Sequence, residues 1–110
     1  DHAASESSSE IQARVQQALA RQAQRYQNEN YSYNGKISAR GVQKHCVLQG
    51  EAKDLMRHSI DKLNLSGRSF DRVLKVARTI ADLEGCAQIE MPHVAEAMQY
   101  RKISFNKRGE

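Results

Sequence analysis

Residues 66–85 read SGRSFDRVLKVARTIADLEG, and this stretch decides the fold class of the chain. Its apolar residues recur at helical spacing and cover more than half of a helix circumference. They are Phe70, Val73, Leu74, Val76, Ala77, Ile80, Ala81 and Leu83. Ser66 can cap the first turn, and Gly85 can end the last turn in the left-handed conformation. We therefore predict a helix over residues 67–84 that forms the central and most buried element.

The polar residues of this predicted helix share one narrow stripe along its surface. They are Arg68, Arg72, Lys75, Thr79 and Asp82. A polar stripe on such an apolar helix is where contacts with solvent, a ligand or another subunit are expected.

A first helix is predicted before the central one. Ser7 and Glu10 have the spacing of a capping box, so this helix should begin near Glu10. Its apolar stripe needs a partner to cover it and consists of Ile11, Val15, Ala18, Leu19 and Tyr26. Residues 27–44 then lack a clear period and carry turn signals, so we expect a long connection with a short helical turn near Val42.

Two more helices complete the prediction. Apolar residues at helical spacing indicate a helix over residues 51–63. Pro92 suits the first position of a last helix, which should run to about Tyr100. The expected architecture is a bundle of about four helices.

Composition agrees with an all-α fold in one domain. The 110 residues include one Pro and six Gly, too few for the frequent tight turns of a β sandwich. Hydrophobic residues make up 39% and aromatic residues only 5%, which suits a core of aliphatic side chains. We expect the domain to span residues 10–103, with a flexible N-terminal segment or linker over 1–9 and a flexible tail over 104–110.

Charge and cysteine content limit the function only weakly. The net charge of +4 permits a nucleic-acid contact without requiring one. Because no long apolar run or export signal is present, we expect a cytoplasmic protein without membrane contact. Cys46 and Cys86 are expected to be reduced thiols with packing roles.

Residues 65–85 together with 93–101 resemble the C-terminal domain of the ComM family, which are magnesium-chelatase-like AAA+ ATPases of bacteria. Residues 8–25 resemble the opening helix of that domain, and residues 34–48 resemble its connecting segment. The resemblance therefore covers nearly the whole chain. It implies a helical bundle of the AAA+ lid type.

The resemblance also implies a role in ATP-driven DNA processing during natural transformation. ATP and Mg²⁺ would be bound by the full-length parent, and no cofactor is expected on this fragment alone, because it lacks the Gly-x-x-x-x-Gly-Lys-Ser/Thr phosphate loop. We expect the fragment not to be an enzyme. The implied partners are its own AAA+ core domain and the neighbouring subunits of a ring, commonly a hexamer in this superfamily.

In AAA+ proteins the lid supplies a cation called sensor 2 to the bound nucleotide, and Arg68 matches its position near the start of a helix. A guanidinium can fork onto phosphate oxygens and report whether the terminal phosphate is present. The alternative is that Arg68 is a solvated residue of a first helical turn. Arg72 and Lys75 could extend a nucleotide or inter-subunit surface, although a solvated face is the expectation that we favour for them.

DNA is a further partner to consider. Arg14, Arg21 and Arg25 share one helical face, which we place opposite the apolar stripe, and they are candidates for contacts with DNA phosphates. An exposed Gln- and Arg-rich helix is expected equally without any ligand. The alternative functions are therefore an autonomous nucleic-acid-binding helical module and a structural protein-interaction bundle.

No catalytic residue or metal site is expected. The candidate ligands are His45, Cys46, Cys86 and His93. Their spacing forms no Cys-x-x-Cys or His-x-x-x-His pair, which metal sites commonly use.

Overall fold

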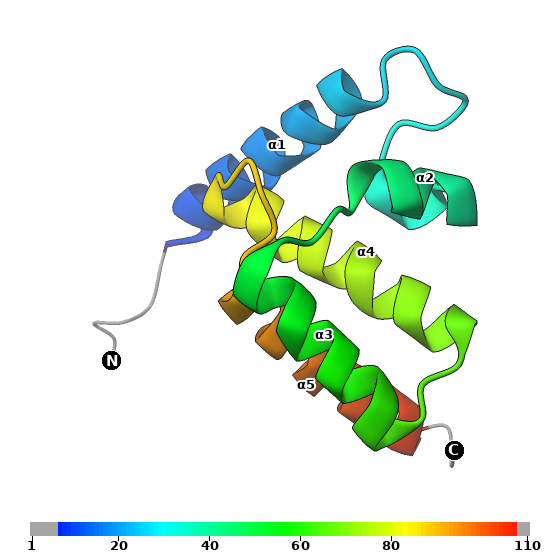
Figure 1. Ribbon diagram of the computed structural model, residues 1–110. Coiled ribbons are helices and arrows are strands. Elements are labelled where there is room, and N and C mark those ends of the chain that lie inside the picture. The colour runs from blue at the N-terminus through cyan, green and yellow to red at the C-terminus, as the bar shows by residue number, and fades with distance from the viewer. Residues whose placement is uncertain (1–6, 108–110) are drawn as a thin grey trace.

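The computed structural model describes residues 7–107 and the side chains of residues 7–100. Within this range the chain forms five α-helices and one 3₁₀ helix, and no strand (Figure 1). The elements are α1 (Ser8–Arg25), η1 (Asn34–Lys36), α2 (Ala39–His45), α3 (Gly50–Leu63), α4 (Gly67–Glu84) and α5 (Met91–Lys107). The predicted all-α class is confirmed, with α2 as a fifth helix within the expected connection.

Helix α4 is the centre of the bundle, as predicted. The Ser66 hydroxyl accepts a hydrogen bond from the Ser69 backbone amide at 3.2 Å and so caps the first turn. Gly85 ends the helix at φ 77°, in the left-handed region that favours glycine. Helices α1, α2 and α5 and the turn η1 all pack against α4, whereas α3 packs mainly against α5.

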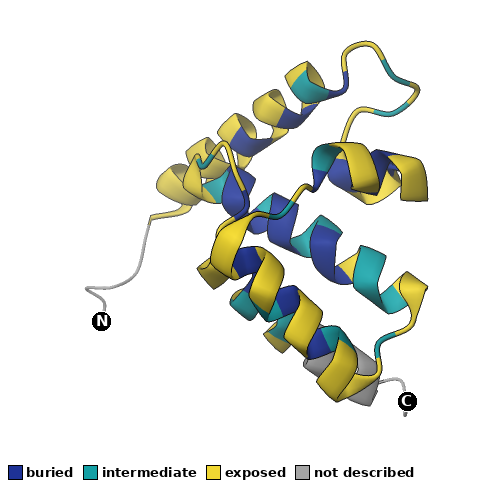
Figure 2. Ribbon diagram, viewed as in Figure 1, coloured by how far each residue is buried: buried dark blue, intermediate teal, exposed yellow. Residues whose placement is uncertain are grey.

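The core lies along α4 and the sides of the helices that face it (Figure 2). Val73, Ala77 and Ala81 of α4 are at most 1% exposed, as are Val94 and Ala97 of α5. Small residues at these positions let the two helix axes approach closely.

Helix α1 begins with the predicted capping box. Ser7 accepts from the Glu10 backbone amide at 3.1 Å, and the Glu10 carboxylate accepts from the Ser7 amide at 2.9 Å. The helix starts at Ser8, two residues earlier than expected and inside the segment 1–9. The expected flexibility of residues 1–6 lies outside the described residues.

The apolar stripe of α1 differs from the prediction. Ala18 and Tyr26 are buried, but Ile11, Val15 and Leu19 are 40–46% exposed. Residues 7–17, which include the first two of these residues, are all exposed. The stripe that needed a partner therefore finds one within the domain only over its last turns.

Helix α5 extends beyond the predicted end at Tyr100 and runs to Lys107. It therefore passes the expected domain end at residue 103 and enters the expected tail, of which residues 108–110 lie outside the described part. No helix in the described part is long and apolar enough to cross a membrane.

Candidate functional site

Arg68 lies in the first turn of α4 and is exposed, in agreement with its predicted place at a helix start. A Cβ added at the neighbouring Gly67 would meet no atom within 4 Å, so this end of the helix faces open space. Among the side chains of residues 7–100, Arg68 has no hydrogen-bond or ion-pair partner. Its guanidinium is therefore available to a ligand or another domain.

The rest of the polar stripe passes from solvent into the interior. Arg72 is exposed, Lys75 and Thr79 are partly buried, and Asp82 is fully buried. Sequence periodicity could not show this gradient, because it arises where α1 and η1 cover the C-terminal half of α4. Arg68 and Asp82 lie 14 positions apart, which is about 21 Å along a helix.

Asp82 is the centre of a buried polar network between α1, η1 and α4. It accepts two hydrogen bonds from Arg25, at 3.0 Å from Nη1 and 2.6 Å from Nη2. It also accepts one from Asn34 Nδ2 at 3.0 Å. Arg78 Nη2 lies 3.3 Å from the same carboxylate. Such bidentate contacts hold the guanidinium in one orientation, in addition to the attraction between the opposite charges.

Asn34 joins α1 to this network. Its side-chain oxygen accepts from the Tyr26 hydroxyl at 2.6 Å, and its backbone amide donates to Gln22 Oε1 at 2.9 Å. Its Nδ2 also donates to Thr79 at 2.9 Å. Asn34 belongs to the predicted connection over residues 27–44, where asparagines indicate turns, and the sequence does not indicate that it is buried.

Arg25 does not lie on the exposed face where we placed it. Its side chain is 18% exposed and is held by Asp82. Burial by itself lowers the pKa of Arg25, but the hydrogen bonds and charge of Asp82 outweigh burial, so the pKa is raised. The expectation of an exposed basic face is therefore wrong for Arg25, because Asp82 offers a buried carboxylate that the sequence pattern of α1 could not reveal.

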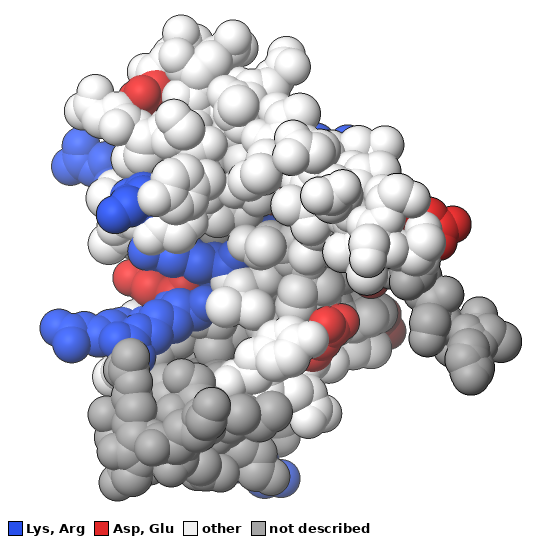
Figure 3. All heavy atoms as spheres, turned by 180° about the vertical axis from the view of Figure 1, so that it is seen from behind, with Lys and Arg blue, Asp and Glu red and all other residues white. Residues whose placement is uncertain are grey.

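Arg14 and Arg21 remain exposed. The Arg21 guanidinium lies beside Gly85, where an added Cβ would come within 3.2 Å of its Nη2. A cation at this place faces the carbonyl end of α4, which is favourable. From behind, Lys and Arg side chains gather along one side of the molecule, with acidic atoms between two of them (Figure 3).

From the sequence, Arg78 is a surface cation that could contact a subunit or DNA, but the structure buries it. It is 4% exposed and donates to the backbone carbonyls of Ala87 at 3.1 Å and Cys86 at 2.9 Å. Burial lowers the pKa of Arg78, and the Asp82 charge does not fully compensate. Arg78 thus holds the turn between α4 and α5.

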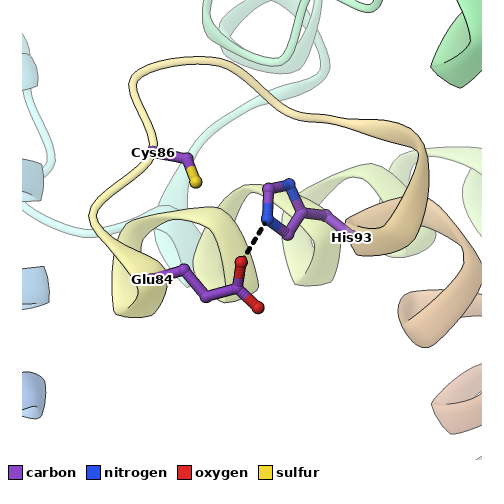
Figure 4. A group of neighbouring side chains, drawn as sticks. All are labelled: Glu84, Cys86 and His93. Atoms are coloured by element: carbon purple, nitrogen blue, oxygen red, sulfur yellow. Dashed lines mark hydrogen bonds and ion pairs between the residues drawn. The ribbon is translucent and has the colours of Figure 1, made fainter.

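Glu84, Cys86 and His93 form a cluster at this turn, with candidate ligand atoms within 4.8 Å of one another (Figure 4). His93 Nδ1 accepts from the Glu90 backbone amide at 2.8 Å, so its Nε2 carries the proton and donates to Glu84 Oε1 at 2.9 Å. A metal-binding histidine usually donates a proton from its second nitrogen, and here that nitrogen is an acceptor. The arrangement favours a capping role for His93 at the start of α5.

Cys46 and Cys86 are free thiols. Cys46 is 3% exposed in the core, and burial raises its pKa to about 11. A thiol with this pKa stays protonated at neutral pH, which makes it a poor nucleophile. The expected packing role of Cys46 is confirmed.

Comparison with known proteins identifies the family. The family described as magnesium chelatase, subunit ChlI C-terminal, matches residues 5–101. The chain belongs to this family. Its relatives include the uncharacterized protein YifB of Salmonella typhimurium, with 40% identity over 98 residues, or 89% of this chain and 19% of that protein.

Two further relatives support the same assignment. The competence protein ComM of Haemophilus influenzae is 40% identical over 70 residues, which cover 64% of this chain and 14% of that protein. The uncharacterized protein YifB of Escherichia coli is 37% identical over 98 residues, which cover 89% of this chain and 19% of that protein. The chain thus spans about a fifth of the length of most of these relatives, and it is a C-terminal domain of the ComM type. No solved structure matches it.

Proposed function

We propose that this chain is the lid domain of a ComM-like AAA+ ATPase and that Arg68 is its nucleotide-sensing residue. The observation that carries the proposal is the position of Arg68, exposed at the capped start of the central helix and without a partner among residues 7–100. A cation on a rigid helix can bind phosphate oxygens of a nucleotide held by another domain. Membership of the magnesium chelatase C-terminal family supports this role.

The exposed stripe of α1 supports docking on another domain. Ile11, Val15 and Leu19 follow one another at intervals of four residues and stay 40–46% exposed. A contiguous apolar stripe on a helix commonly marks an interaction surface. In this proposal the AAA+ core of the parent covers the stripe, and the core binds ATP and Mg²⁺. Arg72 and Lys75 extend the polar surface toward the nucleotide or a neighbouring subunit.

The proposed role of the parent is ATP-driven DNA processing in natural transformation. It is supported by the relationship to a protein named competence protein ComM. Autonomous DNA binding by this domain has less support, because Arg25 is held by Asp82 and only Arg14 and Arg21 of the three arginines remain exposed.

The test is the ATP turnover of the full-length parent with Arg68→Ala. We expect turnover at saturating ATP to fall by about tenfold or more, because a charge-assisted contact to the phosphates is lost. Arg68→Lys keeps the positive charge but loses the planar guanidinium that can bind phosphate through two hydrogen bonds. This variant should therefore have more activity than Arg68→Ala but less than the unchanged parent.

Arg57→Ala, on the exposed side of α3, is the matched control and should keep full turnover. The thermal unfolding of each variant of the 110-residue chain shows that the fold is intact. Unchanged turnover with Arg68→Ala would remove Arg68 from the sensing role.

A further inference from the structure

A pocket of about 250 Å³ lies where the end of α1, the end of α2 and the turn between α4 and α5 meet. Its polar lining comes from Arg25, Lys44, His45, Gln49, Arg78 and Gln88. Among the described residues that line the pocket, none is Asp or Glu. Cationic side chains without a carboxylate among the lining residues are typical of sites for anions.

The positive charge around the pocket is not fully compensated. Arg25 and Arg78 share one carboxylate, Asp82. Lys44 lies 3.5 Å from Glu29, which also contacts His45 at 2.6 Å. Three permanent cations therefore meet two carboxylates, and an excess of positive charge remains at a partly buried place, where it is costly.

Arg78 supplies a second, independent observation. Its Nε is buried and lacks a hydrogen-bond partner among the described residues. The residue is 4% exposed, so solvent does not readily satisfy this donor. Buried donors without acceptors are rare in folded proteins, and each one suggests a missing partner.

We propose that this pocket binds a phosphate-class oxyanion between Arg25, Arg78 and Lys44. The pocket has several times the volume of about 30 Å³ that a water molecule occupies in the liquid, so a tetrahedral anion fits. The anion lies against the two guanidinium groups and Lys44 and neutralises the excess charge. The site is separate from Arg68, which is at the opposite end of α4, so it does not depend on the nucleotide-sensing role.

The proposal can be tested with the 110-residue chain and inorganic phosphate. Sodium phosphate is titrated at constant ionic strength, with sodium chloride as the balancing salt, while the Arg78 Nε–H signal is followed by NMR. We expect a saturable shift of this signal and a rise in the melting temperature. A signal that does not move, or one that moves equally with chloride, would overturn the proposal.

Lys44→Gln is the decisive variant, because the Lys44 side chain is 67% exposed and is not needed for the core. It should weaken the affinity for phosphate by about threefold to tenfold, since one charged contact is lost. Lys53→Gln, on the exposed side of α3, is the matched control and should bind phosphate like the unchanged chain. Equal affinities for all three proteins would contradict the assigned site.

Short DNA oligonucleotides then distinguish the source of the phosphate group. If the same signal shifts at lower concentrations of DNA than of inorganic phosphate, the site takes the phosphodiester backbone, and the affinity should fall with added salt. If only inorganic phosphate shifts the signal, the site takes the free anion.

Discussion

The side chain of Asp82 has no exposed surface, and its carboxylate is the common partner of Arg25 and Arg78. The Asp82 carboxylate therefore holds the side chains of Arg25 in α1 and Arg78 in α4 in place. A buried ion pair of this kind adds little compared with an apolar pair, but the loss of one member leaves an uncompensated charge in the interior. The free energy of unfolding should be sensitive to this one side chain.

We expect Asp82→Asn to lower the free energy of unfolding by about 3 kcal/mol, because two guanidinium groups then lack a counter-charge. Urea unfolding followed by circular dichroism measures the change. Asp54→Asn on the exposed side of α3 is the control and should have an effect within about 0.5 kcal/mol. A similar small effect for both variants would show that the network contributes little.

At the scale of an element, the connection between α1 and α2 is held by Glu29. Its carboxylate accepts from the Tyr31 hydroxyl and contacts His45 Nε2, each at 2.6 Å. The hydrogen bond from Tyr31 and the contact with His45 lower the pKa of Glu29 below the usual 4.5. Because the folded pKa is lower than the unfolded one, this stabilisation is present above pH 4.5 and is lost as the pH falls through the folded pKa.

Glu29→Gln should therefore make the free energy of unfolding less dependent on pH between pH 6 and pH 3. The variant is expected to be less stable than the unchanged chain at pH 6 and to differ less from it at pH 3. Urea unfolding at both pH values measures this difference. Glu51→Gln, in the exposed first turn of α3, should keep the original pH dependence, and the same dependence in Glu29→Gln would refute the assignment.

At the scale of the whole molecule, the proposed docking of the apolar stripe of α1 can be tested separately from the stability of the domain. We expect the triple variant Ile11→Gln, Val15→Gln and Leu19→Gln to change the free energy of unfolding of the chain by no more than about 1 kcal/mol, because these side chains are already half exposed. Under the proposed function, the same variant of the full-length parent should have a lower ATP turnover, because the proposed contact between the stripe and the ATPase core is weakened.

Val73→Gln is the control for this experiment, because Val73 is 1% exposed and its replacement should unfold the chain. Chemical unfolding of the chain and ATP turnover of the parent are the two measurements. A triple variant that is strongly destabilised by itself would show that the stripe belongs to the core. Unchanged turnover would show that the stripe does not dock on the ATPase core.

Much of the fold was predictable from local patterns. The caps at Ser66 and Gly85 lie close to the residues they cap, so the bounds of α4 were correct. The helix over 51–63 and the helical turn near Val42 were also correct, although the first begins at Gly50 and the second is the complete helix α2. These features depend on hydrogen bonds between residues near one another in the chain.

Among the candidate site residues, the sequence could predict the position of an exposed residue but not that of a residue held in the interior. The exposed position of Arg68 follows from its place in a first helical turn. The inward position of Arg25 does not follow from its helix, because its partner Asp82 is 57 positions away in the sequence. The sequence by itself determined the helices, their caps and the central place of α4, since periodicity and capping are local. Only the tertiary structure decided which arginines are buried, which apolar stripe stays uncovered and where the cationic pocket forms, because each of these depends on side chains from helices that meet only in the folded chain.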